Sequence, residues 1–264
     1  TTGANEISPA MKFAIIVPAR LASKRFPHKL LHKVMGKPVI LWTAERIRAE
    51  APEFPLFFAV DSDVLLHPLQ SAGYQVIMTD PAHSCGTDRI AEANRIVQAE
   101  YVINVQGDEP TVTGEQIRRL AALIQRDVAM ATLGTPLLRQ EDYCNPNHVK
   151  LVCDSSGNAI YFSRAPIPYF RDSDGAFDCE ASKRCPVLIH LGLYAYRGDF
   201  LETFSKMPPG KLEDIEKLEM LRVLESGYHI AVGTSKDFLI EIDTPEQALE
   251  FEQFVRNGFP STSH

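Results

Sequence analysis

The chain has no long apolar run. None of the hydrophobic stretches in its 264 residues approaches the roughly 20 residues that a helix needs to cross a bilayer. Residues 1–10 also lack the basic start and the apolar stretch of a signal peptide. These absences predict a protein without a membrane partner. They favour reading residues 1–10 as an N-terminal extension, disordered or left over from cloning.

Cysteine is scarce and follows no pattern. The sequence has five cysteines, an odd number, and no two of them have CxxC spacing. Such usage disfavours a structural zinc site. It is typical of a chain whose thiols stay reduced, so we expect a cytoplasmic location.

Positive charge is not in excess, since the net charge is −7 at pH 7. This sign disfavours a nucleic acid or an anionic membrane as partner. It does not exclude a small anionic substrate, whose binding depends on local basic clusters. Hydrophobic residues make up 45% of the chain and charged residues 23%, a balance that allows a sizeable core.

The order of the apolar segments predicts an α/β fold. Short apolar runs typical of buried strands alternate with segments in which apolar residues have helical spacing. Strands and helices that alternate in this way indicate a mostly parallel sheet with helices on both faces. The predicted strands are 12–17, 56–60, 74–78, 101–105 and 128–133, and the predicted helices are 39–49, 87–98 and 112–125.

This alternation changes near Pro146. Residues 148–153 and 159–163 flank a turn-rich segment, which predicts a hairpin. The remaining predicted elements are a polar loop over 166–186, strands over 186–197, 228–232 and 238–242, and helices over 211–226 and 245–255. We interpret residues 11–264 as a single domain with a smaller lobe inserted at about 146–210.

A basic loop follows the first predicted strand. From Pro18 to Lys29 the sequence has four cations, Arg20, Lys24, Arg25 and Lys29. Ligands of an open parallel sheet bind at the carboxyl ends of its strands, where this loop lies. Clustered cations repel one another unless an anion joins them, and a triphosphate suits arginine and lysine donors. The alternative is a solvated basic loop, and we expect an exposed Lys29 that contributes little to stability.

The loop contains neither GxGxxG nor GxxxxGK[ST], so neither a dinucleotide-binding fold nor a P-loop is indicated. Two acids follow other predicted strands: Asp108 lies after the strand at 101–105, and Asp243 after the strand at 238–242. Both acids are therefore expected to face the basic loop. Magnesium takes one or two carboxylates together with phosphate oxygens, which this pair provides. Taken alone, Asp108 has an equal alternative as a helix-capping acid.

Asp61-Ser62-Asp63, after the predicted strand at 56–60, resembles the DxD motif of metal-dependent glycosyltransferases. The tripeptide is common by chance, and capping of the next helix explains it better. A glycosyltransferase is therefore a rival interpretation of the chain.

Together these motifs resemble one family, the 3-deoxy-manno-octulosonate cytidylyltransferases, also called CMP-Kdo synthetases. The resemblance runs from Lys12 to about Val255, nearly the whole chain. So many matches in the same order are specific, unlike any one motif. The matching residues are Pro18-Ala19-Arg20 with Ser23, Arg25, Pro27 and Lys29; His83 with Gly86-Thr87-Asp88-Arg89; Asn104-Val105-Gln106-Gly107-Asp108-Glu109-Pro110; Met130-Ala131-Thr132-Leu133; Tyr161-Phe162-Ser163-Arg164-Ala165-Pro166-Ile167-Pro168; His190-Leu191-Gly192; Glu213, Glu216, Glu219 and Arg222; and Asp243-Thr244-Pro245.

The resemblance implies a Rossmann-like nucleotidyltransferase that joins CTP to Kdo, giving CMP-Kdo and pyrophosphate, with Mg²⁺ as cofactor. The product would enter lipopolysaccharide or capsule synthesis. The resemblance further implies a homodimer, in which the inserted lobe serves sugar binding and dimerisation.

Roles for individual residues also follow from the resemblance. Catalytic roles are implied for Arg20, Arg25, Lys29 and Asp108, and metal binding for Asp108 and Asp243. Nucleotide contacts are implied for Pro18, Ala19, Arg20, Lys29, His83, Gly86, Arg89 and Gln106, and sugar contacts for Gln106, Arg164, His190, Glu216 and Glu219.

The chain departs from the family pattern at four positions. His28 and Glu241 stand where the family has glycine, and Cys85 stands where it has serine. Met220 replaces a glutamine that is expected to contact the sugar. An 8-amino analogue of Kdo, or another sugar acid such as a sialic acid, is therefore an alternative substrate. A non-catalytic nucleotide-binding protein of the same fold is a further alternative, although such a protein would be expected to lack some of the charged residues.

Overall fold

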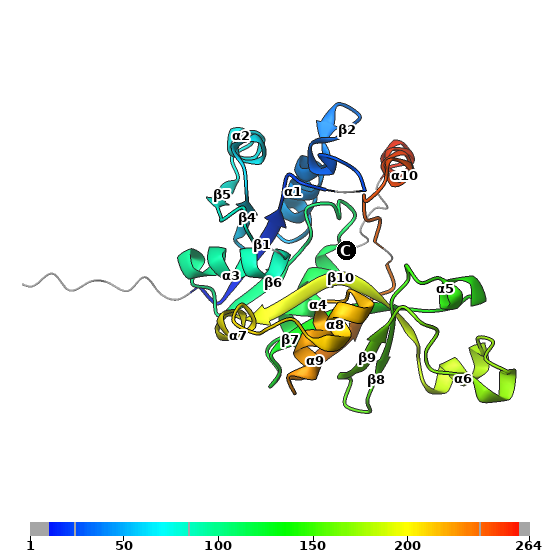
Figure 1. The fold of residues 1–264 in the computed structure, drawn as a ribbon. Helices are drawn as coiled ribbons and strands as arrows, with labels where there is room; N and C mark the ends of the chain where they lie inside the picture. Colours follow the sequence, from blue (N-terminus) through cyan, green and yellow to red (C-terminus); the bar gives the residue numbers. More distant parts are fainter. Residues whose placement is uncertain (1–10, 24, 84, 238, 259–264) are drawn as a thin grey trace, which may run out of the picture.

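A computed structural model describes residues 11–23, 25–83, 85–237 and 239–258 (Figure 1). Its centre is a sheet in which strands lie side by side in the order β11-β7-β10-β6-β1-β4-β5, with β8 paired to β10 and β9 to β8. β2 and β3 form a separate pair. The strands are β1 (Phe13–Ala19), β2 (Lys33–Val34), β3 (Lys37–Pro38), β4 (Leu56–Val60), β5 (Gln75–Met78), β6 (Tyr101–Asn104), β7 (Met130–Pro136), β8 (Lys150–Cys153), β9 (Ala159–Ser163), β10 (Leu188–Arg197) and β11 (Ile230–Thr234).

Along the seven-strand path, every strand except β10 runs in the same direction. β1 pairs in parallel with β4 and β6, β4 pairs in parallel with β5, and β11 with β7. β10 is antiparallel to both of its neighbours, β6 and β7, so these two run the same way as each other. The sheet is therefore mainly parallel, which confirms the predicted fold class. The carboxyl ends of six strands share one edge.

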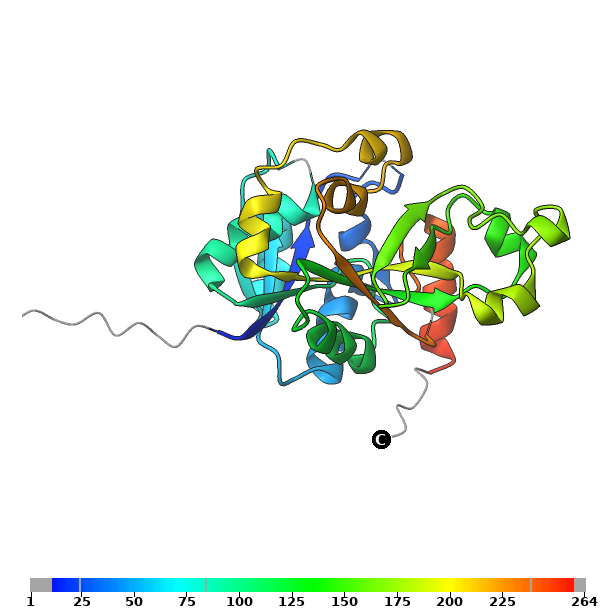
Figure 2. The ribbon, with the colours of Figure 1, turned by 90° about the horizontal axis from the view of Figure 1, so that it is seen from below.

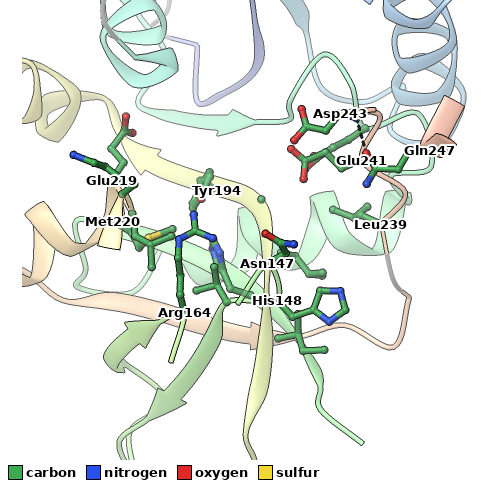
Figure 3. Close-up of a pocket in the computed structure, with 18 of the residues that line it drawn as sticks. Asn147, His148, Arg164, Tyr194, Glu219, Met220, Leu239, Glu241, Asp243 and Gln247 are labelled. Atoms are coloured by element: carbon green, nitrogen blue, oxygen red, sulfur yellow. Dashed lines mark hydrogen bonds between the residues drawn. The ribbon is translucent and has the colours of Figure 1, made fainter. Parts of the chain in front are cut away.

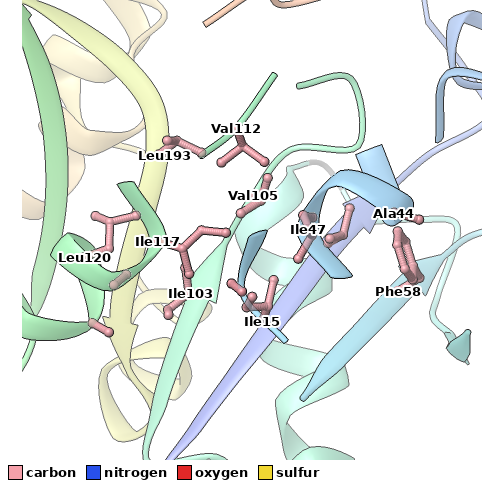
Figure 4. Packing of buried hydrophobic residues seen from close by; sticks show 14 of the residues in the cluster. Ile15, Ala44, Ile47, Phe58, Ile103, Val105, Val112, Ile117, Leu120 and Leu193 are labelled. Atoms are coloured by element: carbon pink, nitrogen blue, oxygen red, sulfur yellow. The ribbon is translucent and has the colours of Figure 1, made fainter. Parts of the chain in front are cut away.

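Helices cover both faces of the sheet. Successive side chains of a buried strand point to opposite sides, so each face presents apolar side chains for helices to pack on. Ile15 of β1 belongs to the core on one side, shown in Figure 4, and Ile16 to the core on the other side. The first core includes α1 (Val39–Glu50), α2 (Asp63–Ser71) and α4 (Gly114–Leu123), and the second α3 (Gly86–Val97), α7 (Gly198–Phe204) and α9 (Met220–Glu225). In the described part of the chain, no helix has both the length and the apolar character needed to cross a membrane.

The β8–β9 hairpin lies at one end of the molecule with α5 (Gln140–Cys144) and α6 (Cys179–Arg184), as Figure 1 and Figure 2 both show. Its antiparallel pairing confirms the predicted hairpin. The polar loop predicted over 166–186 contains α6. β10 belongs to the same predicted lobe range of 146–210, yet it runs through the middle of the main sheet. The division into a main domain and an inserted lobe stays a prediction.

Two predicted elements near the C-terminus are wrong. The helix predicted over 211–226 is divided into α8 (Lys211–Glu216) and α9, because Lys217 has a left-handed φ of 55° and ends α8. A strand was predicted over 238–242, but residues 239–242 form none. Phe238 lies outside the described residues, as does the extension predicted at 1–10. The final predicted helix is present as α10 (Pro245–Arg256).

Candidate active site

The loop after β1 lines a cleft of about 1250 Å³ at the carboxyl edge of the sheet. Arg20, Arg25 and Lys29 all line this first cleft, together with Asp108 from the loop after β6. The structure thus brings three cations of the predicted triphosphate loop together with one of the predicted metal ligands. Lys24, the fourth cation of that loop, lies outside the described residues.

Asp108 and Asp243 meet in the first cleft, as predicted, although more than a hundred residues separate them. Each is only 7% exposed. Lys29 donates hydrogen bonds to both carboxylates, and Arg25 forms an ion pair with Asp243. The two acids therefore share the cations that line the cleft with them.

Asp243 reaches this position without ending a strand, which corrects the prediction. The Ile242 N–H donates to the carbonyl of Asp108 at 3.0 Å, and the Ile240 N–H donates to Thr111 Oγ1 at 2.9 Å. These bonds attach the segment to the loop after β6 rather than to the edge of the sheet. The same contact that replaces the predicted strand brings the two acids together.

A third carboxylate completes the group, and the sequence analysis did not assign it a role. The carboxylate oxygens of Asp108, Glu241 and Asp243, called here the acidic cluster, lie within 4.8 Å of one another. Oxygen ligands at this spacing suit a hard divalent cation, so these residues fit Mg²⁺. Desolvation in the cleft, followed by the charges of Asp108 and Asp243, raises the pKa of Glu241. The only signal in the sequence was a departure, because Glu241 replaces a glycine of the family pattern.

Lys29 is largely buried, which corrects the expectation of an exposed loop lysine. Its side chain is 16% exposed. Burial lowers the pKa of Lys29, but the charges and hydrogen bonds of Asp108 and Asp243 raise it more, so the net shift is upward. The ammonium lies between two like charges and offsets their repulsion.

A hollow of about 300 Å³ adjoins the first cleft. It brings together seven of the eight residues predicted to contact the nucleotide, and only Lys29 lies in the cleft instead. The side chains are fixed by neighbours, since His83 contacts Glu92 and Arg89 donates to Thr79. The lining residues are Pro18, Ala19, Arg20, His83, Cys85, Gly86, Arg89 and Gln106.

Asp61 of the DxD-like tripeptide supports the basic loop. Its Oδ1 accepts a hydrogen bond from the Leu21 N–H at 2.9 Å, and its Oδ2 lies 3.6 Å from Arg89. Asp63 lies in the first turn of α2. Neither acid belongs to the acidic cluster. The tripeptide stands at the start of α2, but its N-cap residue Ser62 makes no side-chain capping hydrogen bond, so helix capping is not confirmed; Asp61 holds the basic loop instead.

A second cleft, of about 520 Å³, adjoins the first, and Arg25, Glu241 and Asp243 line both. Figure 3 shows Arg164 rising toward Tyr194, with the carboxylates of Glu241 and Asp243 on the other side of the cleft. Three of the residues predicted to contact a sugar line this cleft: Arg164, His190 and Glu219. Gln106, predicted to contact both substrates, lines the first cleft and the hollow instead.

Main-chain carbonyls hold Arg164. Its Nε donates to the carbonyl of Glu216 at 2.8 Å and its Nη1 to the carbonyl of Pro146 at 3.1 Å. The Glu216 carboxylate accepts hydrogen bonds from Ser163 Oγ at 2.6 Å and from the Arg164 N–H at 2.9 Å. Glu216, predicted to contact the sugar, therefore lies behind Arg164 and is not part of the cleft wall. No carboxylate in the described part of the chain forms an ion pair with Arg164, so its charge faces the cleft.

Two further residues of the clefts were missed by the sequence analysis. Glu109 is 2% exposed and packs against Gly192, where an added Cβ would lie 2.7 Å from Glu109 Oε1. Burial raises the pKa of Glu109 well above its usual range. Lys217 lines both clefts from the break between α8 and α9. Its role could not be foreseen because one continuous helix was expected there.

We expect the imidazole of His190 to stay neutral across the physiological pH range. Burial lowers its pKa to about 3, and its Nε2 lies 3.0 Å from Thr132 Oγ1. Because the pKa in the folded state lies below the usual value of 6.5, protonation favours unfolding. This contribution to stability is present above pH 6.5 and is lost as the pH falls below it. Proton NMR from pH 5 to 8, assigned with His190→Gln, should show no titration, and a midpoint near 6.5 would contradict this expectation.

The chain is similar to proteins of known activity. A family model described as "Cytidylyltransferase" matches residues 14–236. The 3-deoxy-manno-octulosonate cytidylyltransferase of Syntrophobacter fumaroxidans is 44% identical over 241 residues, which cover 89% of this chain and 94% of that protein. The 8-amino-3,8-dideoxy-manno-octulosonate cytidylyltransferase of Shewanella woodyi is 39% identical over 242 residues, covering 89% and 95%. A solved structure of CMP:2-keto-3-deoxy-manno-octonic acid synthetase complexed with CTP is 32% identical with a TM-score of 0.84, covering 93% of this chain and 99% of that chain.

Proposed function

This chain belongs to the cytidylyltransferases, and within them to the 3-deoxy-manno-octulosonate cytidylyltransferase family, and from that premise we propose that it transfers CMP from CTP to Kdo. The products are CMP-Kdo and pyrophosphate. The observation that carries the proposal is the acidic cluster facing a basic loop at the junction of two clefts. A nucleoside triphosphate fits the first cleft with its hollow, and a sugar acid fits the second.

The reaction is a direct in-line transfer. The anomeric hydroxyl of the sugar acid attacks the α-phosphorus of CTP, a new O–P bond forms, and the bond to pyrophosphate breaks while the hydroxyl proton passes to water. Arg20, Arg25 and Lys29 stabilise the charge that develops on the departing pyrophosphate. Arg164 binds the sugar carboxylate, which matches the planar shape of its guanidinium. His190 offers the sugar a neutral hydrogen-bonding group.

We propose Mg²⁺ as the cofactor, with Asp108 and Asp243 as its ligands and Glu241 as a further oxygen donor. When bound, the ion neutralises charge on the phosphates and polarises the reacting oxygens. Lys29 bridges the two aspartates, and it would exchange these partners for phosphate oxygens when the nucleotide binds. In this proposal Lys29 neutralises the aspartates before the nucleotide binds and binds phosphate afterwards.

Three further properties are proposed from family membership. The protein forms a homodimer, acts in the cytoplasm, where CTP is available, and delivers its product to lipopolysaccharide or capsule synthesis. Light scattering coupled to size-exclusion chromatography tests the first of these, and a monomer at micromolar concentration would refute it.

Release of pyrophosphate from CTP tests the proposed reaction. We expect release with Kdo or its 8-amino analogue, in the presence of Mg²⁺, and none without a sugar acid. Release with sialic acid, but not with Kdo or its 8-amino analogue, would show that the substrate is another sugar acid. A protein that binds CTP but releases no pyrophosphate with any sugar acid would be the non-catalytic alternative.

The 8-amino analogue is the second candidate substrate, because Met220 lines the second cleft and is 5% exposed. If the wild type favours the analogue, Met220→Gln should shift the preference toward Kdo, since a hydrogen bond gained at a buried sugar hydroxyl is worth about 1–3 kcal/mol. Competition between the two sugars measures the ratio in both proteins. Met35→Gln is the control, because Met35 is exposed and outside both clefts. An unchanged ratio would show that residue 220 does not contribute to the choice between the two sugars.

A further inference from the structure

A lysine to which the proposed reaction gives no role is buried next to residues that line the second cleft. Lys150 is 0% exposed. Its Nζ donates to the carbonyl of Arg164 at 2.7 Å and to the carbonyl of Asn145 at 2.8 Å. No carboxylate in the described part of the chain forms an ion pair with it. Burying an ammonium without a countercharge is costly, so its retention calls for a reason.

The position of Lys150 in the sheet links it to the predicted sugar contacts. On β8 it pairs with Ser163 of β9 and with Ile189 of β10. Arg164 follows directly after the end of β9, His190 is the next residue on β10, and both line the second cleft. Lys150 therefore occupies the strand between the two side chains that face the sugar acid.

The two carbonyls that Lys150 binds belong to two different walls of the cleft. One is the carbonyl of Arg164 itself. The other, at Asn145, begins the segment 145–148, in which Pro146 accepts a hydrogen bond from Arg164 Nη1 and Asn147 and His148 line the cleft. A single ammonium thus joins the main chain of Arg164 to the segment whose Pro146 carbonyl accepts a hydrogen bond from the Arg164 guanidinium.

The charges around Lys150 leave a surplus of positive charge. Burial lowers the pKa of Lys150; Cys144 and then the charge of Glu216 oppose this shift, and the charge of Arg164 adds to it. Two cations and one carboxylate then lie together, and the Glu216 carboxylate is occupied by Ser163 and the Arg164 N–H. A carboxylate placed against Arg164 would balance this surplus, whereas a neutral group would not.

From these contacts we infer that Lys150 is a positioning residue, which fixes Arg164 and the segment 145–148 for recognition of the carboxylate of the sugar acid. The inference rests on the proposed function and extends it to a residue that does not touch the substrate. Lys150 supplies both the placement of the guanidinium and part of the positive potential of the site.

The test compares Kdo with its C1 carboxamide in steady-state pyrophosphate release. Lys150→Met removes the ammonium and both hydrogen bonds at nearly constant volume. We expect it to raise the KM for Kdo about tenfold or more and to change the KM for CTP by less than about twofold. The preference for Kdo over the carboxamide should fall by a similar factor, a readout that general loosening of the fold would not change.

Leu151→Ala is the matched control, because Leu151 is the next residue on β8 and is also fully buried, in the hydrophobic core. It should lower the melting temperature and leave the preference for the carboxylate intact. If Lys150→Met does not fold, Lys150→Gln, which keeps a donor but no charge, serves the same comparison. An unchanged preference in the Lys150 variant, or an equal loss in Leu151→Ala, would overturn the inference. A wild-type protein that releases no pyrophosphate with Kdo or its analogue would refute the proposed function instead, and the inference with it.

Discussion

Replacing Asp108 by asparagine is expected to lower the rate of CMP transfer by on the order of 100-fold or more, and Asp243→Asn is expected to do the same. Each change keeps the size of the side chain but removes one negative charge from a cluster whose oxygens lie within 4.8 Å. Added Mg²⁺ should not restore the rate, because a ligand charge is lost together with a contact. Pyrophosphate release over a range of Mg²⁺ concentrations measures the effect.

Binding of Mn²⁺ to each variant, followed by electron paramagnetic resonance, reports on the site without turnover. Without metal, the affinity for CTP should stay the same or rise slightly, since a negative charge facing the phosphates is gone. Asp199→Asn is the control, because Asp199 pairs with Arg197 and lines neither cleft. Near-normal turnover in either the Asp108 or the Asp243 variant would refute the shared metal site.

Lys29→Met is expected to have the second largest effect, and it should act on turnover and on stability together. The substitution removes the cation between two buried carboxylates. We expect the metal-free protein to lose about 1–3 kcal/mol of unfolding free energy, since the buried Asp108 loses its ion-pair partner, while Asp243 keeps Arg25. We also expect kcat/KM for CTP to fall by on the order of 100-fold, because a donor to the triphosphate is lost. Thermal unfolding and pyrophosphate release measure the two effects.

Magnesium offers an internal check on the Lys29 prediction. A divalent cation can replace the missing ammonium between the aspartates, so Mg²⁺ should raise the melting temperature of Lys29→Met more than that of the wild type. Lys37→Met is the matched control, because Lys37 pairs with Glu45 at the surface. Equal stabilisation of wild type and variant by Mg²⁺ would show that Lys29 does not share a position with the metal.

The strands and the basic loop could be predicted because their signals are local. Residues 12–17 form a short apolar run before Pro18, and β1 (Phe13–Ala19) covers most of this run. In a parallel sheet the carboxyl ends of the strands share one edge, which predicts that Arg20 and Asp108 lie together. The hairpin at β8 and β9 was predicted for the same reason, since turn residues separate two apolar runs.

The errors arise where tertiary contacts decide the outcome. Residues 239–242 have a strand-like pattern, but Ile240 and Ile242 form hydrogen bonds to the loop after β6. Lys29 was expected to be exposed, because a sequence does not show that two distant acids will surround it. The interruption at Lys217 had no glycine or proline to mark it.

Some features have no sequence signal that a single chain can supply. Glu216 matched the family pattern, yet its carboxylate supports the main chain at Arg164. Lys150 reads as an ordinary polar position in an alternating strand, and only the register of β8 shows that it lies between two cleft strands. The role of a residue that acts by positioning another residue is therefore harder to predict from the sequence.

On the ribosome, the acidic cluster assembles later than the basic loop that faces it. Translation delivers the N-terminal part first, so β1, the basic loop and Asp108 emerge long before the segment that carries Ile242 and Asp243. The hydrogen bond from the Ile242 N–H to the carbonyl of Asp108 cannot form until that segment has left the exit tunnel. A nascent chain therefore has the cations of the basic loop early, without the acidic cluster that faces them. The site that we propose for Mg²⁺ is therefore complete only once residues 239–243 have folded onto the loop after β6.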